Sequence, residues 1–216
     1  MCALARKLGR PKDPDLETRR KAQILAAAAT AFAELGFAGT QVQTIADRLG
    51  VGNGTVFRYF PTKKALFLAA VEFGLKDLTD EMDAILATDA NPLTQFREVV
   101  RQYLRFFHNR PEMAELFIQE RASFRHHHRP LYFSTKDEQE RCKHDAFFAR
   151  LLASGAIRPI PQERFMSVVG DLLYGTILTN LLSGRPVDPD AQAADVLDVI
   201  GHGVLAEPPK SKGGKK

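Results

Sequence analysis

The segment Asn53–Tyr59 (NGTVFRY) places amide, hydroxyl, aromatic and guanidinium groups within seven residues and contains no acid. Such groups hydrogen-bond phosphates and read the edges of base pairs. If the segment is helical, its outer side is expected to carry five of these residues: Asn53, Thr55, Phe57, Arg58 and Tyr59. Exposed aromatic rings beside an arginine suit a helix laid in a DNA groove better than a purely structural corner.

A second set of side chains raises the alternative of a metal site. It consists of His126, His127 and His128 with Cys142 and His144. A triple histidine and Cys-x-His lack the i, i+4 spacing of helix-borne sites, and no fourth ligand is implied. A positively charged loop is the preferred interpretation, so we expect no metal and no cofactor.

An all-helical enzyme is a further alternative. The chain shows no paired carboxylates in an apolar setting, no nucleophile motif and no phosphate-binding loop. We therefore expect a protein that is not an enzyme. A ligand-independent architectural DNA-binding protein is the third possibility, and binding without sequence preference would distinguish it.

Two short helices are expected to position the segment 53–59. Thr40 is a candidate N-cap for a helix ending near Leu49, and Gly50-Val51-Gly52 breaks the chain before the next helix. Two helices joined in this way form a helix-turn-helix. The small core between them is predicted to contain Ile45, Ala46, Leu49, Val51 and Val56.

Charge is distributed unevenly along the 216 residues. Residues 1–64 carry 11 Lys+Arg against 5 Asp+Glu, whereas residues 65–209 carry 15 against 21. A basic end on an acidic body indicates a polyanionic partner for the N-terminal part. Within the basic arm that precedes the first helix, the candidate DNA contacts are Arg6, Arg10 and Lys12.

The remaining apolar residues recur at helical spacing, which predicts an all-α protein of about nine helices and no strands. The predicted regions are a basic arm (1–14), a helix-turn-helix domain (15–61), a larger helical domain (62–206) and a basic tail (207–216). No run of eighteen apolar residues occurs, so we expect no membrane-spanning helix. No secretory signal is recognisable, and two cysteines, Cys2 and Cys142, fit a reducing cytoplasm.

Residues 44–66, TIADRLGVGNGTVFRYFPTKKAL, resemble the tetracycline-repressor (TetR) family of transcriptional regulators. The resemblance includes the preceding helix (15–36), ending in Gly36-Phe37, and covers about the first 70 residues. It implies a dimeric regulator, most often a repressor, that binds double-stranded DNA with palindromic half-sites and responds to a small molecule. Phe57 stands where the family usually has tyrosine, and Gly52 stands where a capping serine is frequent.

The resemblance also implies roles for particular residues. Thr40 and Lys63 would contact DNA phosphates, and Gly54 would face the groove with Asn53 and Thr55, followed by Phe57, Arg58 and Tyr59. Residues from about 65 onward would bind the effector and form the dimer through the last two helices.

The aromatic content of the C-terminal region favours an apolar or aromatic effector. The candidate ligand-binding residues are Tyr103, Phe107, Met113, Phe117, Phe147, Tyr174 and Leu178. The candidate dimer-interface residues are Val169, Leu173, Ile177, Leu181, Leu197, Ile200 and Val204.

Overall fold

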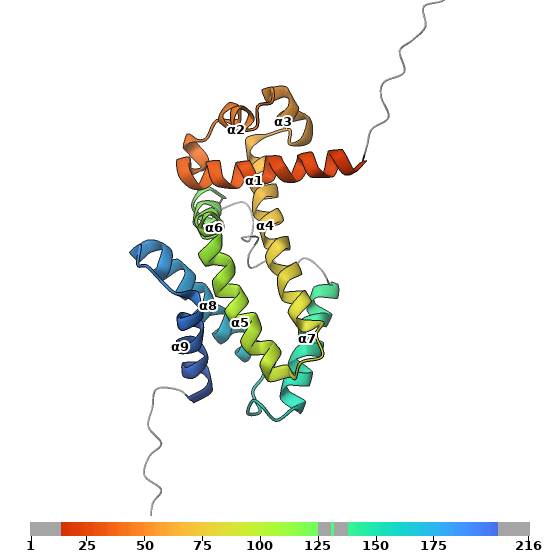
Figure 1. Cartoon of the computed structure of the whole chain (residues 1–216), viewed down its shortest axis with the longest axis vertical. Coiled ribbons are helices and arrows are strands. Elements are labelled where there is room, and N and C mark those ends of the chain that lie inside the picture. The colour runs from red at the N-terminus through yellow and green to blue at the C-terminus, as the bar shows by residue number, and fades with distance from the viewer. Residues whose placement is uncertain (1–13, 125–130, 132–137, 203–216) are drawn as a thin grey trace, which may run out of the picture. The chain divides into compact units, whose positions relative to one another are not determined.

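Apolar residues at helical spacing produce helices throughout the part of the chain that the structure describes. The computed structural model describes residues 14–124, 131 and 138–202, and over these residues it contains nine α-helices and no strand (Figure 1). The helices are α1 (Pro14–Gly39), α2 (Val42–Arg48), α3 (Asn53–Tyr59), α4 (Lys63–Leu86), α5 (Pro92–Asn109), α6 (Pro111–Phe124), α7 (Glu138–Ala153), α8 (Gln162–Ser183) and α9 (Pro189–His202). The prediction of an all-α fold is confirmed.

The chain divides into two compact units. The first contains residues 1–77 and 115–134, and the second contains residues 78–114 and 135–216. Helices α4 and α6 therefore each contribute residues to both units. The predicted boundary between residues 61 and 62 divides the chain by function, into a part that binds DNA and a part that binds the effector. The two compact units do not test that division, so it stays a prediction.

The core of the first unit is built on one face of α1. Ile24, Ala28 and Phe32 lie on this face and are fully buried. Gly36 has φ 74° and ψ 159°, so the regular helix breaks where the sequence predicts. The ring of Phe32 contacts that of Phe67 at a centroid distance of 5.0 Å, which ties α1 to α4.

Helices α2 and α3 lie on one side of α1 (Figure 1). Ile45, Ala46 and Val56 close the small core between them and are fully buried. Gly50 adopts φ 62°, and the amide of Val51 donates to the carbonyl of Ala46 at 3.0 Å. A left-handed residue at this turn is easiest for glycine, so the break has the predicted cause.

Helix α5 organises the second unit and packs against α7, α8 and α9. Asn91 is its N-cap: the Asn91 side chain accepts from the amide of Thr94 at 2.9 Å, and Pro92 follows at the first helical position. Phe96, Val100 and Leu104 form part of its buried stripe. Because this stripe packs against the core, the opposite face of α5 is the one exposed to solvent.

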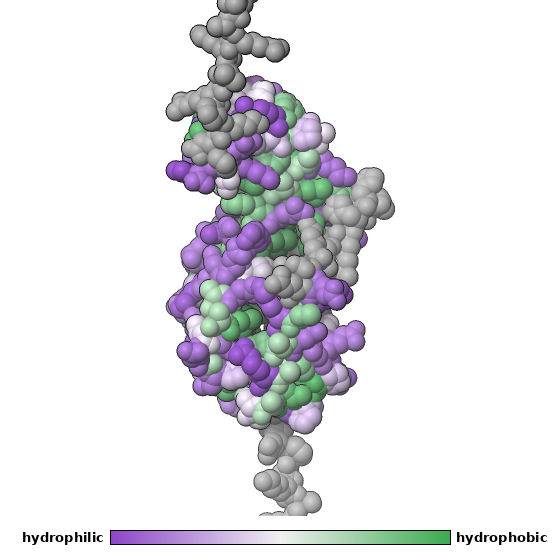
Figure 2. Space-filling view, turned by 90° about the vertical axis from the view of Figure 1, so that its right-hand side faces the viewer, coloured by the Kyte–Doolittle hydropathy of each residue, from purple (hydrophilic) through white to green (hydrophobic). Residues whose placement is uncertain are grey.

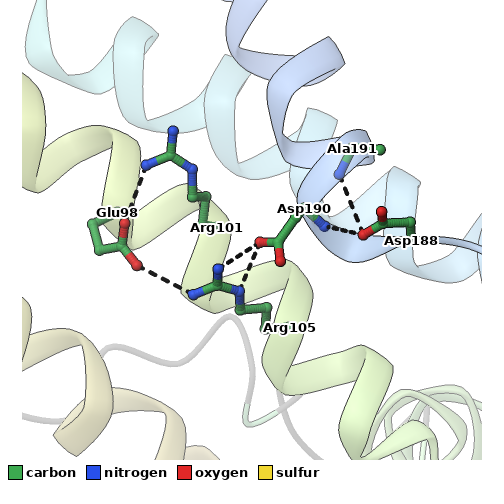
Figure 3. Close-up of polar contacts among 6 residues, drawn as sticks. All are labelled: Glu98, Arg101, Arg105, Asp188, Asp190 and Ala191. Atoms are coloured by element: carbon green, nitrogen blue, oxygen red, sulfur yellow. Dashed lines mark hydrogen bonds and ion pairs between the residues drawn. The ribbon is translucent and has the colours of Figure 1, made fainter.

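Polar contacts also join α5 to α9 (Figure 3). Arg105 pairs with Glu98 on its own helix at 3.4 Å and with Asp190 of α9 at 2.7 Å. Arg101 pairs with the same Glu98 at 3.1 Å. The side chain of Asp188 accepts from the amide of Asp190 at 2.9 Å, which caps the first turn of α9. These groups are partly exposed, so they orient α9 more than they stabilise it.

A buried glutamine fixes the connection between α4 and α5. Gln95 is 1% exposed, and its Nε2 donates to the carbonyl oxygens of Leu86 at 3.1 Å and Thr88 at 2.8 Å. Its Oε1 accepts from Arg150 of α7 at 3.2 Å. One side chain thus satisfies polar groups from the end of α4, the turn and α7.

We expect Gln95→Leu to lower the free energy of unfolding by about 2–3 kcal/mol, because two partly buried carbonyls and a guanidinium lose the same buried partner. Urea denaturation would measure this change. Gln102→Leu removes one hydrogen bond, to the half-buried Glu81, and is expected to cost about 1 kcal/mol or less. Equal effects of the two variants would contradict the role given to Gln95.

Two helices are long and apolar enough to cross a bilayer by length and composition, Asp15–Gly39 and Gln162–Ser183. Core helices of soluble proteins have the same length and apolar composition. Helix α1 carries the core of the first unit, whereas only 11% of the corresponding window of α8 is buried. On the face drawn in Figure 2, hydrophilic side chains surround and interrupt the apolar patches. Because so little of α8 is buried, most of its apolar side chains do not belong to the core of the single chain.

Candidate nucleic-acid interface

Helix α3 carries an outward surface made of the residues singled out in the sequence. Gly54 and Arg58 are exposed, and Phe57 is 41% exposed. Thr55 and Tyr59 are half-buried. A buried Val56 between them holds the helix on the domain, so its neighbours must face away. This surface therefore offers a ring, a guanidinium and a hydroxyl to a partner.

Arg58 and Tyr59 form a pair on this surface. Nη2 of Arg58 donates to Oη of Tyr59 at 3.2 Å, and the guanidinium carbon lies 5.0 Å from the centre of the Tyr59 ring. A stacked guanidinium keeps most of its donors available in a fixed plane. Such a pre-ordered fork matches the acceptor atoms of a guanine edge or of a phosphate.

Asn53 is less available than its position in the sequence suggests. Its side chain is half-buried, and its Oδ1 is buried with no hydrogen-bond partner among the described residues. Gly52 is the N-cap of α3, and no side chain caps the helix. Gly52 stands where a capping serine is frequent in the TetR family, and the first amides of α3 therefore have no side-chain partner.

The structure corrects the role given to Thr40. Its side chain is 1% exposed, and its hydroxyl donates to the carbonyl oxygens of Gly36 at 2.7 Å and Ala31 at 3.2 Å. Gln41, not Thr40, is the N-cap residue of α2. The prediction of Thr40 as N-cap is wrong, and a contact of its buried hydroxyl with phosphate is contradicted. The hydroxyl closes the end of α1 instead.

We expect Thr40→Val to lower the free energy of unfolding by about 1 kcal/mol, because a buried carbonyl of Ala31 and a partly buried carbonyl of Gly36 lose a hydroxyl donor. The slope of log affinity for DNA against log salt should stay unchanged, because no phosphate contact is lost. A slope reduced by about one with unchanged stability would restore the phosphate contact.

Lys63 has a structural task that the sequence did not reveal. Its Nζ donates to the carbonyl oxygens of Thr40 at 3.0 Å and Ala38 at 3.2 Å, and it lies 4.8 Å from the ring of Phe37. These bonds tie the start of α4 to the last turn of α1 and to the residue that follows it. An ammonium has three donors, so one remains for a phosphate.

Two further cations of the first unit were not among the DNA contacts predicted from the sequence. Lys21 of α1 and Lys64 of α4 are both exposed, and their Nζ atoms lie 5.9 Å from the Phe60 ring and 5.0 Å from the Phe124 ring, respectively. Both belong to the basic part of the chain, residues 1–64, and this excess of positive charge was the only feature of the sequence that pointed to them. The predicted contacts Arg6, Arg10 and Lys12 lie outside the described residues and stay predictions.

Comparison with known proteins agrees with this geometry. Residues 24–70, which contain α2 and α3, match the family described as "Bacterial regulatory proteins, tetR family". Residues 24–70 thus belong to the TetR family. The chain is 34% identical over 104 residues to the HTH-type transcriptional regulator RutR of Escherichia coli K12, an alignment covering 47% of each chain. The match thus spans about half of the length of RutR.

Two other proteins extend the comparison beyond the DNA-binding part. The HTH-type transcriptional repressor KstR of Mycobacterium tuberculosis is 24% identical over 170 residues, which cover 76% of this chain and 72% of KstR. The structure of FadR from Bacillus subtilis in complex with stearoyl-CoA aligns with a TM-score of 0.63 and 19% identity. It covers 85% of this chain and 99% of FadR, a likeness that shows the fold.

The predicted ligand-binding residues differ in how far they are buried. Four of them are buried side chains: Tyr103, Phe107, Met113 and Phe117. The other three are half-buried: Phe147, Tyr174 and Leu178. Phe107 lines a cavity of about 310 Å³, together with Leu104 and Ile177. A groove of about 650 Å³ in the second unit is lined by none of the seven.

The structure also corrects the predicted dimer surface. Leu173 and Ile177 are 7% and 3% exposed, so they belong to the core of their own chain. The half-buried predicted residues are Val169, Leu181, Leu197 and Ile200. Val204 lies outside the described residues.

A different face of α8 is exposed and apolar. It is defined by Val168, Leu172, Gly175, Thr179 and Leu182 and is called here the outer α8 face. These residues recur at steps of three and four, so they share one side of the helix. Val168 and Leu182 are 61% and 77% exposed. Such a row of apolar and small residues indicates an interaction surface.

Nothing in the described part of the chain supports a metal site. Cys142 and His144 are exposed on α7, and no group of three His, Cys, Asp or Glu side chains there could hold an ion. The triple histidine at 126–128 lies outside the described residues.

Proposed function

We propose that this chain is a dimeric, sequence-specific DNA-binding transcriptional regulator of the bacterial cytoplasm. It acts as a repressor that a small effector releases from its operator, and it has no catalytic role. The observation that carries the proposal is the outward surface of α3, where Arg58 is stacked and bonded to Tyr59 beside an exposed Phe57. The similarity to RutR, a regulator, and to KstR, a repressor, supports it.

The outer α8 face supports the dimer. Two copies related by a twofold axis would cover the side chains that a single chain leaves in water. A symmetric pair presents two α3 helices, and such dimers read half-sites about one helical turn apart, roughly 34–36 Å. The DNA sequence should therefore be an inverted repeat.

The effector must act by binding two arrangements of the dimer with different affinity. A tenfold change in DNA affinity requires about 1.4 kcal/mol of coupling. FadR from Bacillus subtilis forms a complex with stearoyl-CoA, so a ligand with a long apolar part is compatible with this fold.

Selection from a pool of random-sequence DNA duplexes tests the proposal. The full chain should enrich one inverted repeat and bind it in preference to scrambled DNA of equal length. Binding of duplex DNA with no enriched sequence would favour an architectural protein instead. Absence of any binding to duplex DNA would exclude both.

A further inference from the structure

The groove of about 650 Å³ combines apolar walls with a basic rim. It is formed by the start of α5, residues 156–160, the first half of α8 and the end of α9. Twelve of its sixteen lining residues have apolar side chains, one is glycine, and none is acidic. The other three are Arg97, Arg158 and Arg164. We call it the arginine groove.

These three arginines come from three separate elements: α5, the connection between α7 and α8, and the first turn of α8. All three are exposed, and none makes a hydrogen bond or ion pair within the described part of the chain. Arg101 and Arg105 on the same α5, by contrast, are both paired with carboxylates (Figure 3). One turn earlier, Arg97 is left with its donors facing water.

A single exposed arginine is usually just solvated, and it would need no explanation. Three around one apolar groove are different, because residues 65–209 carry more acid than base, 21 against 15. Unpaired cations are gathered here in a region where carboxylates are plentiful. A guanidinium fork binds a carboxylate or phosphate through two parallel hydrogen bonds.

We propose that the arginine groove binds an anionic amphiphile, a molecule with a carboxylate or phosphate head and an apolar chain. The head lies among Arg97, Arg158 and Arg164, and the chain lies along the apolar wall that includes Phe165 and Leu197. The volume is within the range of about 300–1,000 Å³ typical of small-molecule sites. The site is distinct from the aromatic residues predicted for the ligand, and its ligand is charged.

The groove gives the effector a means to act, and in this the inference rests on the proposed function. Val168 and Leu172 line the groove and also belong to the outer α8 face. A chain bound against them contacts the same helix that is proposed to pair with a second copy. The ligand would thereby distinguish two arrangements of the dimer, as an effector must.

Binding is tested on the full chain without DNA, by isothermal titration calorimetry with dodecanoate, below the concentration at which it forms micelles. Methyl dodecanoate is the neutral control, and dodecanoyl-CoA and coenzyme A separate a carboxylate head from a phosphate head. The variants are Arg97→Gln, Arg158→Gln and Arg164→Gln. The matched control is Arg141→Gln, an exposed arginine of α7 that does not line the groove.

We expect one molecule of dodecanoate or dodecanoyl-CoA per chain, with affinity reduced about tenfold to a hundredfold by each groove variant. Arg141→Gln should bind like the original chain, and octanoate should bind more weakly than dodecanoate because less apolar surface is buried. Preference for dodecanoyl-CoA over dodecanoate identifies a phosphate head, and the reverse identifies a carboxylate.

Equal binding of dodecanoate and its methyl ester would overturn the proposal, because the arginines would then not distinguish a charged head group from a neutral one. Loss of dimers in the groove variants, with no binding of any probe, would assign the groove to the interface between copies instead. DNA binding of the ligand-free chain is measured separately. Failure there would refute the proposed function while leaving binding in the groove to stand or fall by itself.

Discussion

Arg58→Ala is expected to weaken binding to the selected inverted repeat by about tenfold to a hundredfold per half-site, with no change in thermal unfolding. The side chain is exposed and bonded only to Tyr59, so its removal costs the folded chain little. The loss at the DNA reflects one base or phosphate contact, worth about 1–3 kcal/mol when it reads a base. Fluorescence anisotropy with labelled duplex measures it.

Salt dependence separates the two kinds of contact that Arg58 can make. If the guanidinium reads a base edge, the variant keeps its salt slope and loses discrimination at one position of the half-site. If it binds a phosphate, the slope falls by about one and discrimination is kept. Arg121→Ala is the matched control, an equal loss of charge from an exposed residue of α6 in the same unit. Equal effects of the two variants would show that only overall charge matters.

Leu182→Glu is expected to convert the dimer into monomers over at least a hundredfold range of protein concentration. Leu182 is 77% exposed in the single chain, so the substitution leaves the fold intact. In the proposed dimer the twofold axis brings two new carboxylates into one apolar contact. Burying unpaired charges costs several kcal/mol, and about 2.8 kcal/mol already corresponds to a hundredfold.

Sedimentation equilibrium measures the association, and binding to the full inverted repeat should fall with it, because each half-site is then bound independently. Ala149→Glu places the same charge on an exposed position of α7 and should leave the dimer unchanged. Leu182 does not line the arginine groove, so this test is independent of the ligand. A Leu182→Glu chain that still forms tight dimers would exclude the outer α8 face as the interface.

Local signals accounted for much of the fold. The bounds of α3, the cap at Asn91 and the break at Gly36 follow from residues only a few positions apart, where backbone hydrogen bonding leaves few options. The buried set Ile45, Ala46 and Val56 follows equally from helical spacing across one short turn.

The errors have a different origin. Thr40 sits between two helices, and a hydroxyl at that position can serve the end of one as well as the start of the next. Helix α8 is apolar on two sides, so spacing alone could not decide that Leu173 and Ile177 face inward while Leu172 and Leu182 face outward.

The arginine groove could not be predicted from the sequence. Arg97 and Arg158 are 61 positions apart and resemble ordinary surface charges until the chain folds. What distinguishes them is the absence of a carboxylate partner among the described residues, and pairing is decided by tertiary structure. The same holds for Lys63, whose bonds to Ala38 and Thr40 span more than twenty residues.

Photocrosslinking from position 57 tests most directly whether the outer side of α3 lies in the groove of duplex DNA. A benzoyl-phenylalanine in place of Phe57, which is 41% exposed, should crosslink to bases at symmetric positions in both half-sites of the selected repeat. The same group in place of Phe147 on α7 should give no DNA adduct. Adducts to protein alone from position 57, or equal DNA adducts from both positions, would contradict the account.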